Sequence, residues 1–493
     1  MVSKFGPMRL KSAALQQERT QPQRNDPRDD LQIAFQAFLA AYPDYASTHK
    51  LDALRATDYR RLDQQGHVYL DYTGGSLYPE SLLRKHQALL AHNVFGNPHS
   101  KNLTSQAMTQ RVEATRNSVL RYFNADPDEY VAIFTPNASG ALRLVGESYP
   151  FTSASKFLLT FDNHNSVNGI REFARTRRAT LTYIPCVRQS ELRVDVYAVR
   201  QALTQAQPNG SNLFAFPAQS NFTGVQHPLD WIAEAQAHGW DVLLDAAAFA
   251  PTNRLDLQRW HPDFVDISFY KMFGYPTGIG CLLARKTTLQ KLRRPWFAGG
   301  TLAFSSVLGD GHYLTPGAAG FEDGTVNYLG IPAVALGLEL IESLGIETIH
   351  TRVGCLTGWL IEHLLALRHS NGRPVVQLYG PANTNSRGAT VQVNFFDRAG
   401  QMIDCTVVEQ MANAARISLR AGCHCNPGAR ELALGLDKDN LADCFSDQDS
   451  VTFEQFLHGI AGQTTGALRA SLGIASNFSD VHAYLQFART FVA

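Results

Sequence analysis

The stretch WDVLLDAAAFAPTNRLDLQRWHPDFVDISFYKMFGYPTGIG, residues 240–280, contains two largely apolar runs that each end in a charged residue. The first run, WDVLLD, ends at Asp245, and the second, VDISFYK, ends at Lys271. Continuous apolar runs of this length are typical of strands in a parallel sheet that is covered on both faces. Open α/β sheets bind ligands outside the carboxyl ends of their strands, so we expect Asp245 and Lys271 to lie at a binding site.

Apolar strands alternate with helical stretches on both sides of this pair, from about residue 130 to residue 285. Other predicted strands are YVAIFT (130–135), KFLLTF (156–161), NLFAFP (212–217) and GIGCLLA (278–284). Predicted helices between them include ASGALRLVGESY (138–149) and PLDWIAEAQAHG (228–239). This alternation predicts an α/β fold with a large, mostly parallel sheet and helices on both faces.

A smaller α+β unit is predicted towards the C-terminus. The segment IPAVALGLELIESLG (331–345) predicts a helix with Pro332 in its first turn and Gly345 at its C-terminal cap. Strands are predicted at 374–380, 389–397 and 416–422, and a helix at 404–415.

These patterns divide the chain into four parts and one excursion. The expected parts are a flexible tail (1–30), a helical segment that packs on the small domain (31–66), a large domain (67–325) and a small domain (326–493). The segment 430–465 is expected to be an excursion from the small domain.

The composition argues for small-molecule chemistry. Lys and Arg number 44, Asp and Glu also number 44, and no long block of one charge occurs, so neither nucleic acid nor a membrane surface is an expected partner. No run of 18 apolar residues occurs, and the polar first 30 residues lack an apolar signal core. The seven cysteines are sparse and odd in number, which favours a reducing compartment, and we expect a cytoplasmic location.

Asp245 and Lys271 suit pyridoxal 5'-phosphate (PLP). This cofactor needs a lysine that forms an imine with its aldehyde, and an anion at the opposite edge of its ring that keeps the pyridine nitrogen protonated. The spacing of one Asp and one Lys also arises by chance, so further residues are needed.

Three other segments supply such residues. In TPNASGALRLV (135–145), backbone N–H groups at the start of a helix, together with the Ser139 hydroxyl, would hold a phosphate. The alternative is an ordinary N-cap at Ser139. Asn221 in PAQSNFTG could donate to the phenolic oxygen of PLP, and His164 in FDNHNSV could stack on its ring, although a lone histidine is more often structural.

The stretch ISLRAGCHCNPGAR (417–430) places Cys423 and Cys425 two residues apart. Three interpretations are open, namely a metal clip, a redox pair, or one nucleophile with a bystander. If the segment is extended, both thiols lie on one face. A zinc site is disfavoured because Cys444 and His482 are isolated and form no second ligand pair, so no metal is predicted.

Taken together, these motifs resemble one family. They are YLDYTGGSLYP (69–79), GNPHS (96–100), PAQSNFTGV (217–225), LLDAAAFAPT (243–252), SFYKMFGYPTGIG (268–280), FEDGTVNYLG (321–330), RAGCHCNPGA (420–429) and GALRASLG (466–473). In order and spacing they resemble PLP enzymes of the class V aminotransferase fold, and within them the cysteine desulfurase-like domain of molybdenum cofactor sulfurases. The resemblance covers residues 50–493. It implies the PLP-dependent transferase fold type I, with a seven-stranded sheet, and a homodimer.

The resemblance also implies roles for individual residues. Lys271 matches the Schiff-base lysine, Asp245 the partner of the pyridine nitrogen, His164 the ring-stacking residue, and Asn221 the neighbour of the phenolic oxygen. Thr301 matches a phosphate ligand from the neighbouring subunit, Arg469 the arginine that binds the substrate α-carboxylate, and Arg420 a weaker candidate for that role. The remaining expected cofactor residues are Asn137, Ala138, Ser139, Ala247 and Ser268, and the remaining expected substrate residues are Tyr72 and His99.

The implied activity is a PLP-dependent cysteine desulfurase. It converts L-cysteine to L-alanine and leaves a persulfide on Cys425, for transfer to an acceptor protein or small molecule, with Cys423 as a bystander or resolving thiol. Eukaryotic sulfurases carry a further cofactor-binding domain that this sequence does not show, so molybdenum cofactor is one acceptor among several.

Several positions depart from the desulfurase pattern. Ala248 and Tyr270 replace residues common in bacterial desulfurases, and Tyr72 and Arg430 depart from many sulfurases. The alternatives are a selenocysteine lyase or C–S lyase, a class V aminotransferase or epimerase, and a binding scaffold without activity.

Overall fold

The computed structural model describes residues 27–187, 191–436 and 466–493. The tail expected over residues 1–30 therefore lies almost entirely outside the described residues, as do Cys444 and most of the expected 430–465 excursion. Within the described ranges, no helix combines the length and apolar character needed to cross a membrane.

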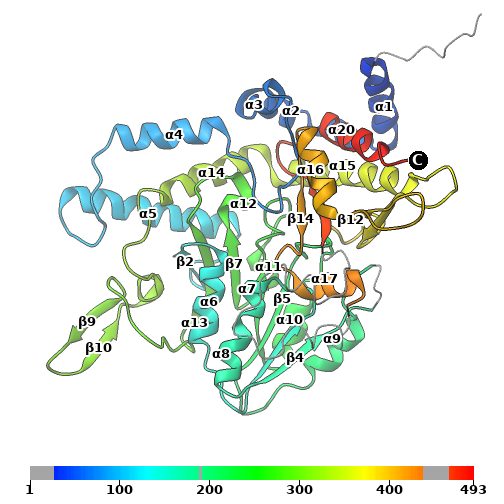
Figure 1. Cartoon of the computed structure of the whole chain (residues 1–493). Helices are drawn as coiled ribbons and strands as arrows, with labels where there is room; N and C mark the ends of the chain where they lie inside the picture. The colour runs from blue at the N-terminus through cyan, green and yellow to red at the C-terminus, as the bar shows by residue number, and fades with distance from the viewer. Residues whose placement is uncertain (1–26, 188–190, 437–465) are drawn as a thin grey trace, which may run out of the picture.

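A seven-stranded sheet forms the centre of the larger part of the molecule (Figure 1). Its strands are β2 (Tyr130–Thr135), β3 (Lys156–Thr160), β4 (Thr180–Ile184), β5 (Asn212–Pro217), β6 (Trp240–Asp245), β7 (Phe264–Ser268) and β8 (Gly280–Arg285). Their order is β2-β8-β7-β6-β5-β3-β4, and only β8 runs antiparallel to its neighbours. The predicted mostly parallel, seven-stranded sheet is confirmed.

Both faces of this sheet are covered, as β5 illustrates. All six of its residues are buried. Phe214 and Phe216 belong to one hydrophobic core, whereas Leu213 and Ala215 belong to another, because successive strand residues point to opposite faces. The helices between the strands are α6 (Ala138–Ser148), α7 (Asn165–Asn168), α8 (Ile170–Thr176), α9 (Val196–Leu203), α10 (Trp231–Ala237), α11 (Leu257–Trp260), α12 (Phe269–Phe273) and α13 (Lys286–Leu289).

The C-terminal part contains a four-stranded antiparallel sheet with the order β11-β12-β15-β14. Its elements are α14 (Ile331–Leu344), α15 (Ile346–Ala366), β11 (Val376–Tyr379), β12 (Thr390–Phe395), α16 (Cys405–Ala414), β14 (Arg420–Gly422), α17 (Pro427–Leu434), β15 (Ala467–Ser471) and α20 (Phe478–Arg489). Gly345 follows α14 with a φ of +78°, a conformation that glycine adopts readily, as predicted for the end of this helix.

The segment 416–422 differs from the single strand predicted for it. It forms two short strands in two sheets, β13 (Ile417–Ser418) and β14, separated by the buried Leu419. β13 pairs in parallel with β1 (Val68–Tyr69), whereas β14 pairs with β15. The change of partner brings the chain just after β1 close to β14 and β15.

The N-terminal helices pack on the C-terminal part. Phe38 is fully buried, with its ring centroid 4.8 Å from that of Phe478 and 5.6 Å from that of Trp359. The remaining elements are α1 (Pro27–Ala41), η1 (Pro43–Thr48), α2 (Lys50–Asp58), α3 (Arg61–Gln64), α4 (Glu80–Ala91), α5 (Leu103–Tyr122), β9 (Leu302–Ser306), β10 (Gly311–Leu314) and η2 (Gly317–Phe321). The hairpin β9–β10 projects from the body of the molecule (Figure 1). The domain limits at 66/67 and 325/326 stay predictions.

Candidate active site

A cavity of about 370 Å³ lies at the carboxyl ends of β5, β6 and β7 and at the start of α6. Every residue predicted to bind the cofactor, except Thr301, lines it. These residues are Asn137, Ala138, Ser139, His164, Asn221, Asp245, Ala247, Ser268 and Lys271. Residues separated by more than 130 positions in the sequence therefore meet at one sheet edge, as expected for an open α/β sheet.

The start of α6 is capped by Asn137 and not by Ser139. The Asn137 side chain accepts a hydrogen bond from the Gly140 N–H at 2.8 Å, and the helix begins at Ala138. The Ser139 hydroxyl is therefore not needed as a cap and lies 2.6 Å from the Ser166 hydroxyl, which also lines the cavity. A helix start lined with hydroxyls attracts anions such as phosphate.

Asp245 and Lys271 both line the cavity wall. Asp245 ends β6, where its carboxylate accepts a hydrogen bond from the Ala247 N–H at 3.0 Å. Lys271 lies in α12, the short helix that directly follows β7. Asp245 ends the apolar run of β6, and Lys271 comes shortly after that of β7. Both residues could therefore be located from the apolar runs in the sequence.

Asp266, which the sequence analysis missed, lies next to Asp245. The two residues are register partners in the parallel strands β6 and β7, so their side chains point to the same face, and both line the cavity. Asp266 is fully buried, and neither carboxyl oxygen has a hydrogen-bond partner among the described residues. Burial and the nearby Asp245 raise its pKa well above the usual value, against the opposing effect of Lys271, which favours the protonated form of Asp266. The sequence feature that could have identified Asp266 is an acidic residue inside an otherwise apolar predicted strand.

His164 presents a neutral imidazole to the cavity. Its Nδ1 accepts a hydrogen bond from the Ser166 N–H at 3.1 Å, which leaves the proton on Nε2. Burial lowers the pKa of His164, with Lys271 and Arg469 acting in the same direction and Asp245 opposing them. A neutral ring at this place has the shape and charge to stack on a flat aromatic ligand.

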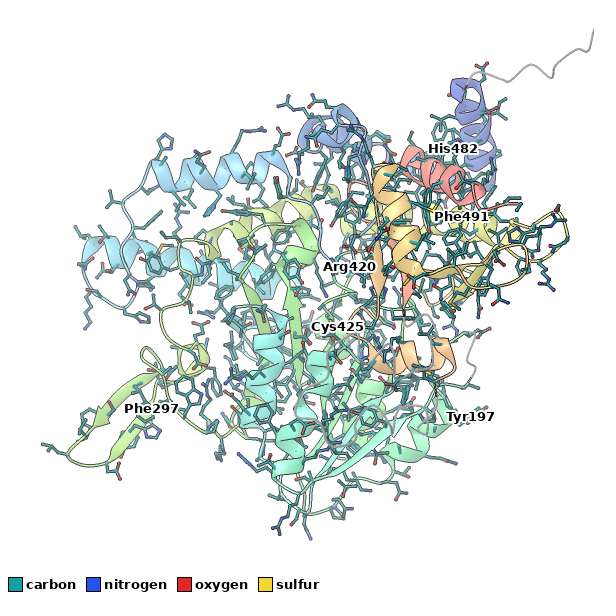
Figure 2. All side chains as sticks on the ribbon, viewed as in Figure 1. Tyr197, Phe297, Arg420, Cys425, His482 and Phe491 are labelled. Atoms are coloured by element: carbon teal, nitrogen blue, oxygen red, sulfur yellow. The ribbon has the colours of Figure 1, made fainter. Side chains whose placement is uncertain are left out.

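The cysteine pair lies on a tight turn, so the extended segment considered for it is wrong. The backbone φ is +123° at Gly422, +53° at His424 and +55° at Cys425. Cys423 is half-buried, whereas Cys425 is exposed. Figure 2 shows Cys425 below Arg420, near the middle of the molecule.

The turn, residues 422–426 and here called the Cys loop, is held against the cavity rim. The Asn165 N–H donates to the Cys425 carbonyl at 2.7 Å, and the Asn221 side-chain amide donates to the His424 carbonyl at 2.7 Å. Because Asn221 lines the cavity and Asn165 follows His164, these bonds hold the backbone of the Cys loop next to the cavity wall, although Cys425 itself does not line the cavity.

Asn426 fixes the same loop from its other end and was missed by the sequence analysis. Its side-chain amide donates to the Asp162 carbonyl at 2.7 Å and to Asn221 Oδ1 at 3.0 Å. Its Oδ1 accepts from the Ala429 N–H at 3.2 Å and so caps α17. The pair Asn426-Pro427 is a helix-start signal that could have identified this residue.

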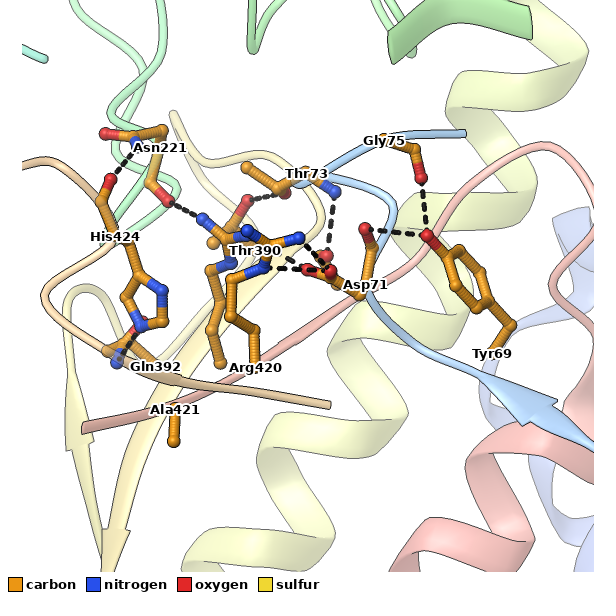
Figure 3. Close-up of polar contacts among 12 residues, drawn as sticks. Tyr69, Asp71, Thr73, Gly75, Asn221, Thr390, Gln392, Arg420, Ala421 and His424 are labelled. Carbon is orange, nitrogen blue, oxygen red and sulfur yellow. Dashed lines mark hydrogen bonds and ion pairs between the residues drawn. The ribbon is translucent and has the colours of Figure 1, made fainter. Parts of the chain in front are cut away.

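Arg420 and Arg469 share one carboxylate (Figure 3). They are register partners on β14 and β15. Arg420 donates from Nε and Nη2 to Asp71 Oδ2 at 2.9 and 2.6 Å, and Arg469 Nη2 donates to Asp71 Oδ1 at 3.0 Å. Arg469 Nη1 also donates to the Asn221 carbonyl at 3.1 Å, which joins the arginine pair to the cavity wall.

The two arginines differ in their surroundings. Arg469 is buried, which lowers its pKa, and its Nε has no partner among the described residues. The Arg420 side chain is half-exposed, and its hydrogen bond to Asp71 raises its pKa.

The known proteins that resemble the chain agree with this geometry. The model of the aminotransferase class-V family matches residues 68–484. The chain belongs to the class V aminotransferase family. It is 35% identical to the molybdenum cofactor sulfurase of Arabidopsis thaliana over 92% of this chain and 60% of that protein. It is 36% identical to the Homo sapiens protein of the same name over 89% of this chain and 51% of that protein. The chain thus spans between one half and two thirds of the length of these curated relatives.

Solved structures show the fold of this class V chain. A cysteine desulfurase from Thermococcus onnurineus NA1 superposes with a TM-score of 0.73 at 24% identity, covering 90% of this chain and 98% of that chain. The cysteine desulfurase CsdA of Escherichia coli gives 0.68 at 22% identity, covering 90% and 99%. The expected PLP-dependent transferase fold type I and the expected family resemblance are both confirmed.

Six predicted site residues of the class V chain do not line this cavity, namely Cys425, Arg420 and Arg469, described above, and Tyr72, His99 and Thr301. Tyr72 is buried and lines a separate cavity of about 20 Å³ together with Lys271. His99 is exposed, whereas Thr301 is fully buried and its hydroxyl donates to the Ala298 carbonyl at 2.7 Å. A Cβ added to Gly300 would lie 3.2 Å from the His99 ring, so His99 and the loop of Thr301 are neighbours. Their roles stay predictions.

Proposed function

We propose that the chain is a PLP-dependent cysteine desulfurase that converts L-cysteine to L-alanine and carries the sulfur as a persulfide on Cys425. The observation that supports it most strongly is the attachment of the Cys loop to the cavity rim through Asn165 and Asn221. An exposed thiol, held beside a cavity that contains Lys271 and Asp245, is the arrangement that sulfur transfer to a cysteine requires.

The residues of the cavity fit PLP. The start of α6 and the hydroxyls of Ser139, Ser166 and Ser268 provide donors for a phosphate, and Asp245 provides the anion for the pyridine nitrogen. PLP would supply an electron sink that makes the substrate Cα proton acidic and weakens the Cβ–Sγ bond.

Three other residues of the cavity wall have separate proposed roles. Lys271 would anchor the cofactor and move the Cα proton, and His164 would cover the ring with a neutral imidazole. Asp266, as a protonated acid beside Asp245, would hydrogen-bond to it and keep a second negative charge away from the cofactor.

The arginine pair would bind the substrate carboxylate. Two guanidinium groups share the single carboxylate of Asp71, so the three side chains carry one net positive charge. A substrate α-carboxylate neutralises that charge, and Arg469 has an unused Nε donor among the described residues. Asp71 would keep both guanidiniums in place before the substrate arrives.

The sulfur step balances without any further reactant. The Cβ–Sγ bond of L-cysteine breaks, an S–S bond forms between that sulfur and the Cys425 Sγ, and the Cβ gains a proton, so that the amino acid leaves as alanine. Cys425 is exposed, so a persulfide on it would be accessible to an acceptor.

We propose molybdenum cofactor as the sulfur acceptor, supported by the names of the curated relatives. We also propose a cytoplasmic homodimer in which Thr301 reaches the phosphate of the neighbouring subunit. This role requires the Thr301 hydroxyl, which is buried in its own chain and donates to the Ala298 carbonyl, to become accessible in the dimer.

A matched pair of variants tests the proposed function. The purified protein is incubated with L-cysteine without an added thiol, and alanine and protein persulfide are measured by mass spectrometry. We expect Cys425→Ser to lose the persulfide and most alanine formation, and Cys423→Ser to keep both. Normal alanine formation by Cys425→Ser would rule out Cys425 as the acceptor. Faster turnover of selenocysteine or cysteine sulfinate than of L-cysteine would identify a lyase instead.

A further inference from the structure

Arg387 is a buried cation without a counter-charge. The residue is 5% exposed, and its Nη2 donates to the Thr223 carbonyl at 2.7 Å. Among the described residues, its Nε and Nη1 have no hydrogen-bond partner, and no carboxylate forms an ion pair with it. By contrast, other buried arginines pair with a carboxylate: Arg55, Arg116, Arg352 and Arg469.

The electrostatic surroundings of Arg387 are unfavourable for an isolated cation. Burial lowers its pKa to about 9, and Arg193, another cation, acts in the same direction. The guanidinium is therefore still charged at neutral pH. A buried charge is stable only when it is paired or bound to a compensating ligand.

The backbone fixes this side chain in place. Arg387 forms a bridge with Val225, the Gln226 N–H donates to the Ser386 carbonyl at 2.9 Å, and the Gly388 N–H donates to the Gly224 carbonyl at 2.7 Å. These contacts fix the backbone from which the side chain extends, and the bond from Nη2 to the Thr223 carbonyl holds the guanidinium itself.

A second unpaired donor lies at the same place. Arg387 lines a small cavity of about 20 Å³ together with Thr357 from α15. Thr357 is 1% exposed, and its hydroxyl has no hydrogen-bond partner among the described residues. A threonine in a helix commonly satisfies its hydroxyl on the carbonyl four residues earlier, so an unpaired one is unusual. The other polar side chains that line the cavity are Thr252, Asn253, His350 and Thr384.

We propose that Arg387 and Thr357 bind a small inorganic monoanion of the size of chloride. The lining contains a guanidinium, hydroxyls and amide groups but no carboxylate, which selects for an anion. The volume is close to that of one water-sized occupant, which excludes phosphate and sulfate. A water molecule would satisfy the donors but would leave the positive charge uncompensated.

The site would support the wall behind the active site. Thr252 and Ala389 line both this cavity and the small cavity that Lys271 and Tyr72 share. A Cβ added to Gly388 would lie 1.9 Å from Oε1 of Gln219, a residue that lines the cofactor cavity. An anion on Arg387 would therefore fix the segment that Gln219 packs against. The inference does not depend on the reaction proposed above.

Bromide is the probe that tests the proposal, because it replaces chloride and scatters X-rays anomalously. Crystals of the cofactor-bound protein are soaked in sodium bromide, and an anomalous peak is expected between the Arg387 guanidinium and the Thr357 hydroxyl. In solution, the melting temperature is measured in sodium chloride and in sodium gluconate at equal ionic strength. We expect it to rise with chloride for the wild type, because a ligand of the folded state stabilises it.

Three variants make the result specific. Arg387→Gln should abolish the chloride dependence, whereas Arg398→Gln, at an exposed position of the same part of the chain, should keep it. Thr357→Val keeps the Arg387 cation and the size of the side chain but removes the hydroxyl. Its melting temperature should respond to chloride only at concentrations on the order of tenfold higher than those needed for the wild type. Thr357→Val keeps the test decisive if Arg387→Gln does not fold. A water molecule at the site, or equal chloride responses in wild type and variants, would overturn the proposal. Bromide density without a chloride response would identify an adventitious ion only and would overturn it as well.

Discussion

The wall of the cofactor cavity and the Cys loop are built in opposite ways. Asp245 ends the central strand β6, and Lys271 lies in α12, the short helix that directly follows the central strand β7, so both lie next to backbone that neighbouring strands fix. The Cys loop is a turn with positive φ at Gly422, His424 and Cys425, and side-chain amides of Asn221 and Asn426 hold it to the wall.

This difference matches two chemical requirements. A cofactor has to stay in one place, so its residues lie on rigid elements. A thiol that receives sulfur inside and delivers it outside needs access to both the cavity and the solvent, which an exposed turn provides. Changes to the wall should therefore remove cofactor binding or turnover, whereas changes to the loop should slow sulfur transfer alone.

Lys271→Ala should have the largest effect. The variant removes the amine that anchors the cofactor and moves the Cα proton, so we expect alanine formation to fall by more than about 10³-fold. The visible absorption of the purified protein should also disappear. Lys286→Ala, at an exposed lysine on α13, is the control and should keep both signals. Persistent visible absorption in Lys271→Ala would contradict the cofactor assignment.

Arg469→Met should be the next largest change. The buried guanidinium would lose its bond to the substrate carboxylate, and kcat/KM for L-cysteine should fall by about 10²-fold, as expected for a charge-assisted hydrogen bond. Arg420→Met should cost less than about tenfold, because its side chain is 50% exposed and water screens its charge. Both variants should keep the visible absorption. A larger loss in Arg420→Met than in Arg469→Met would reverse the assignment of the two arginines.

Asn426→Ala tests the loop and leaves every residue that lines the cavity unchanged. It removes the donors to the Asp162 carbonyl and to Asn221 Oδ1, which should weaken loop placement by about 1–2 kcal/mol and slow persulfide formation on the order of tenfold. Stopped-flow absorbance of the cofactor and a persulfide time course separate the two regions. We expect only the persulfide step to change. The exposed Asn385→Ala is the control, and an altered absorption spectrum in Asn426→Ala would show that the loop also shapes the cofactor site.

The sequence predicted the wall far better than the loop and its partners. Strand ends are visible in local patterns, so Asp245, Lys271 and Asn221 could be located from apolar runs. Asp71 was visible as part of a motif, but its pairing with Arg420 spans 349 positions and arises because 416–422 changes sheets. Such a contact depends on tertiary packing, which local periodicity does not encode. The turn at Cys425 was missed for a related reason, since a non-glycine residue with positive φ has no strong sequence signal.

Asp266→Asn should have the smallest effect on activity but a characteristic pH dependence of stability. The folded protein holds a proton on Asp266 above the usual aspartate pKa of about 3.9, because burial and Asp245 raise the pKa. The unfolded chain binds fewer protons than the folded chain in that range, so this group reduces stability as the pH rises, by at most about 1.4 kcal/mol per pH unit. Asparagine keeps the donor towards Asp245 and does not titrate. As the pH rises from about 5 to 8, the melting temperature of Asp266→Asn should therefore increase relative to that of the wild type.

The control for this comparison is Asp310→Asn, an exposed aspartate on the β9–β10 hairpin, for which the difference from wild type should stay flat with pH. A constant difference for Asp266→Asn would mean that Asp266 is ionised, and the wall would then carry two adjacent negative charges. In that case, the cofactor nitrogen would face a stronger anion than Asp245 alone provides.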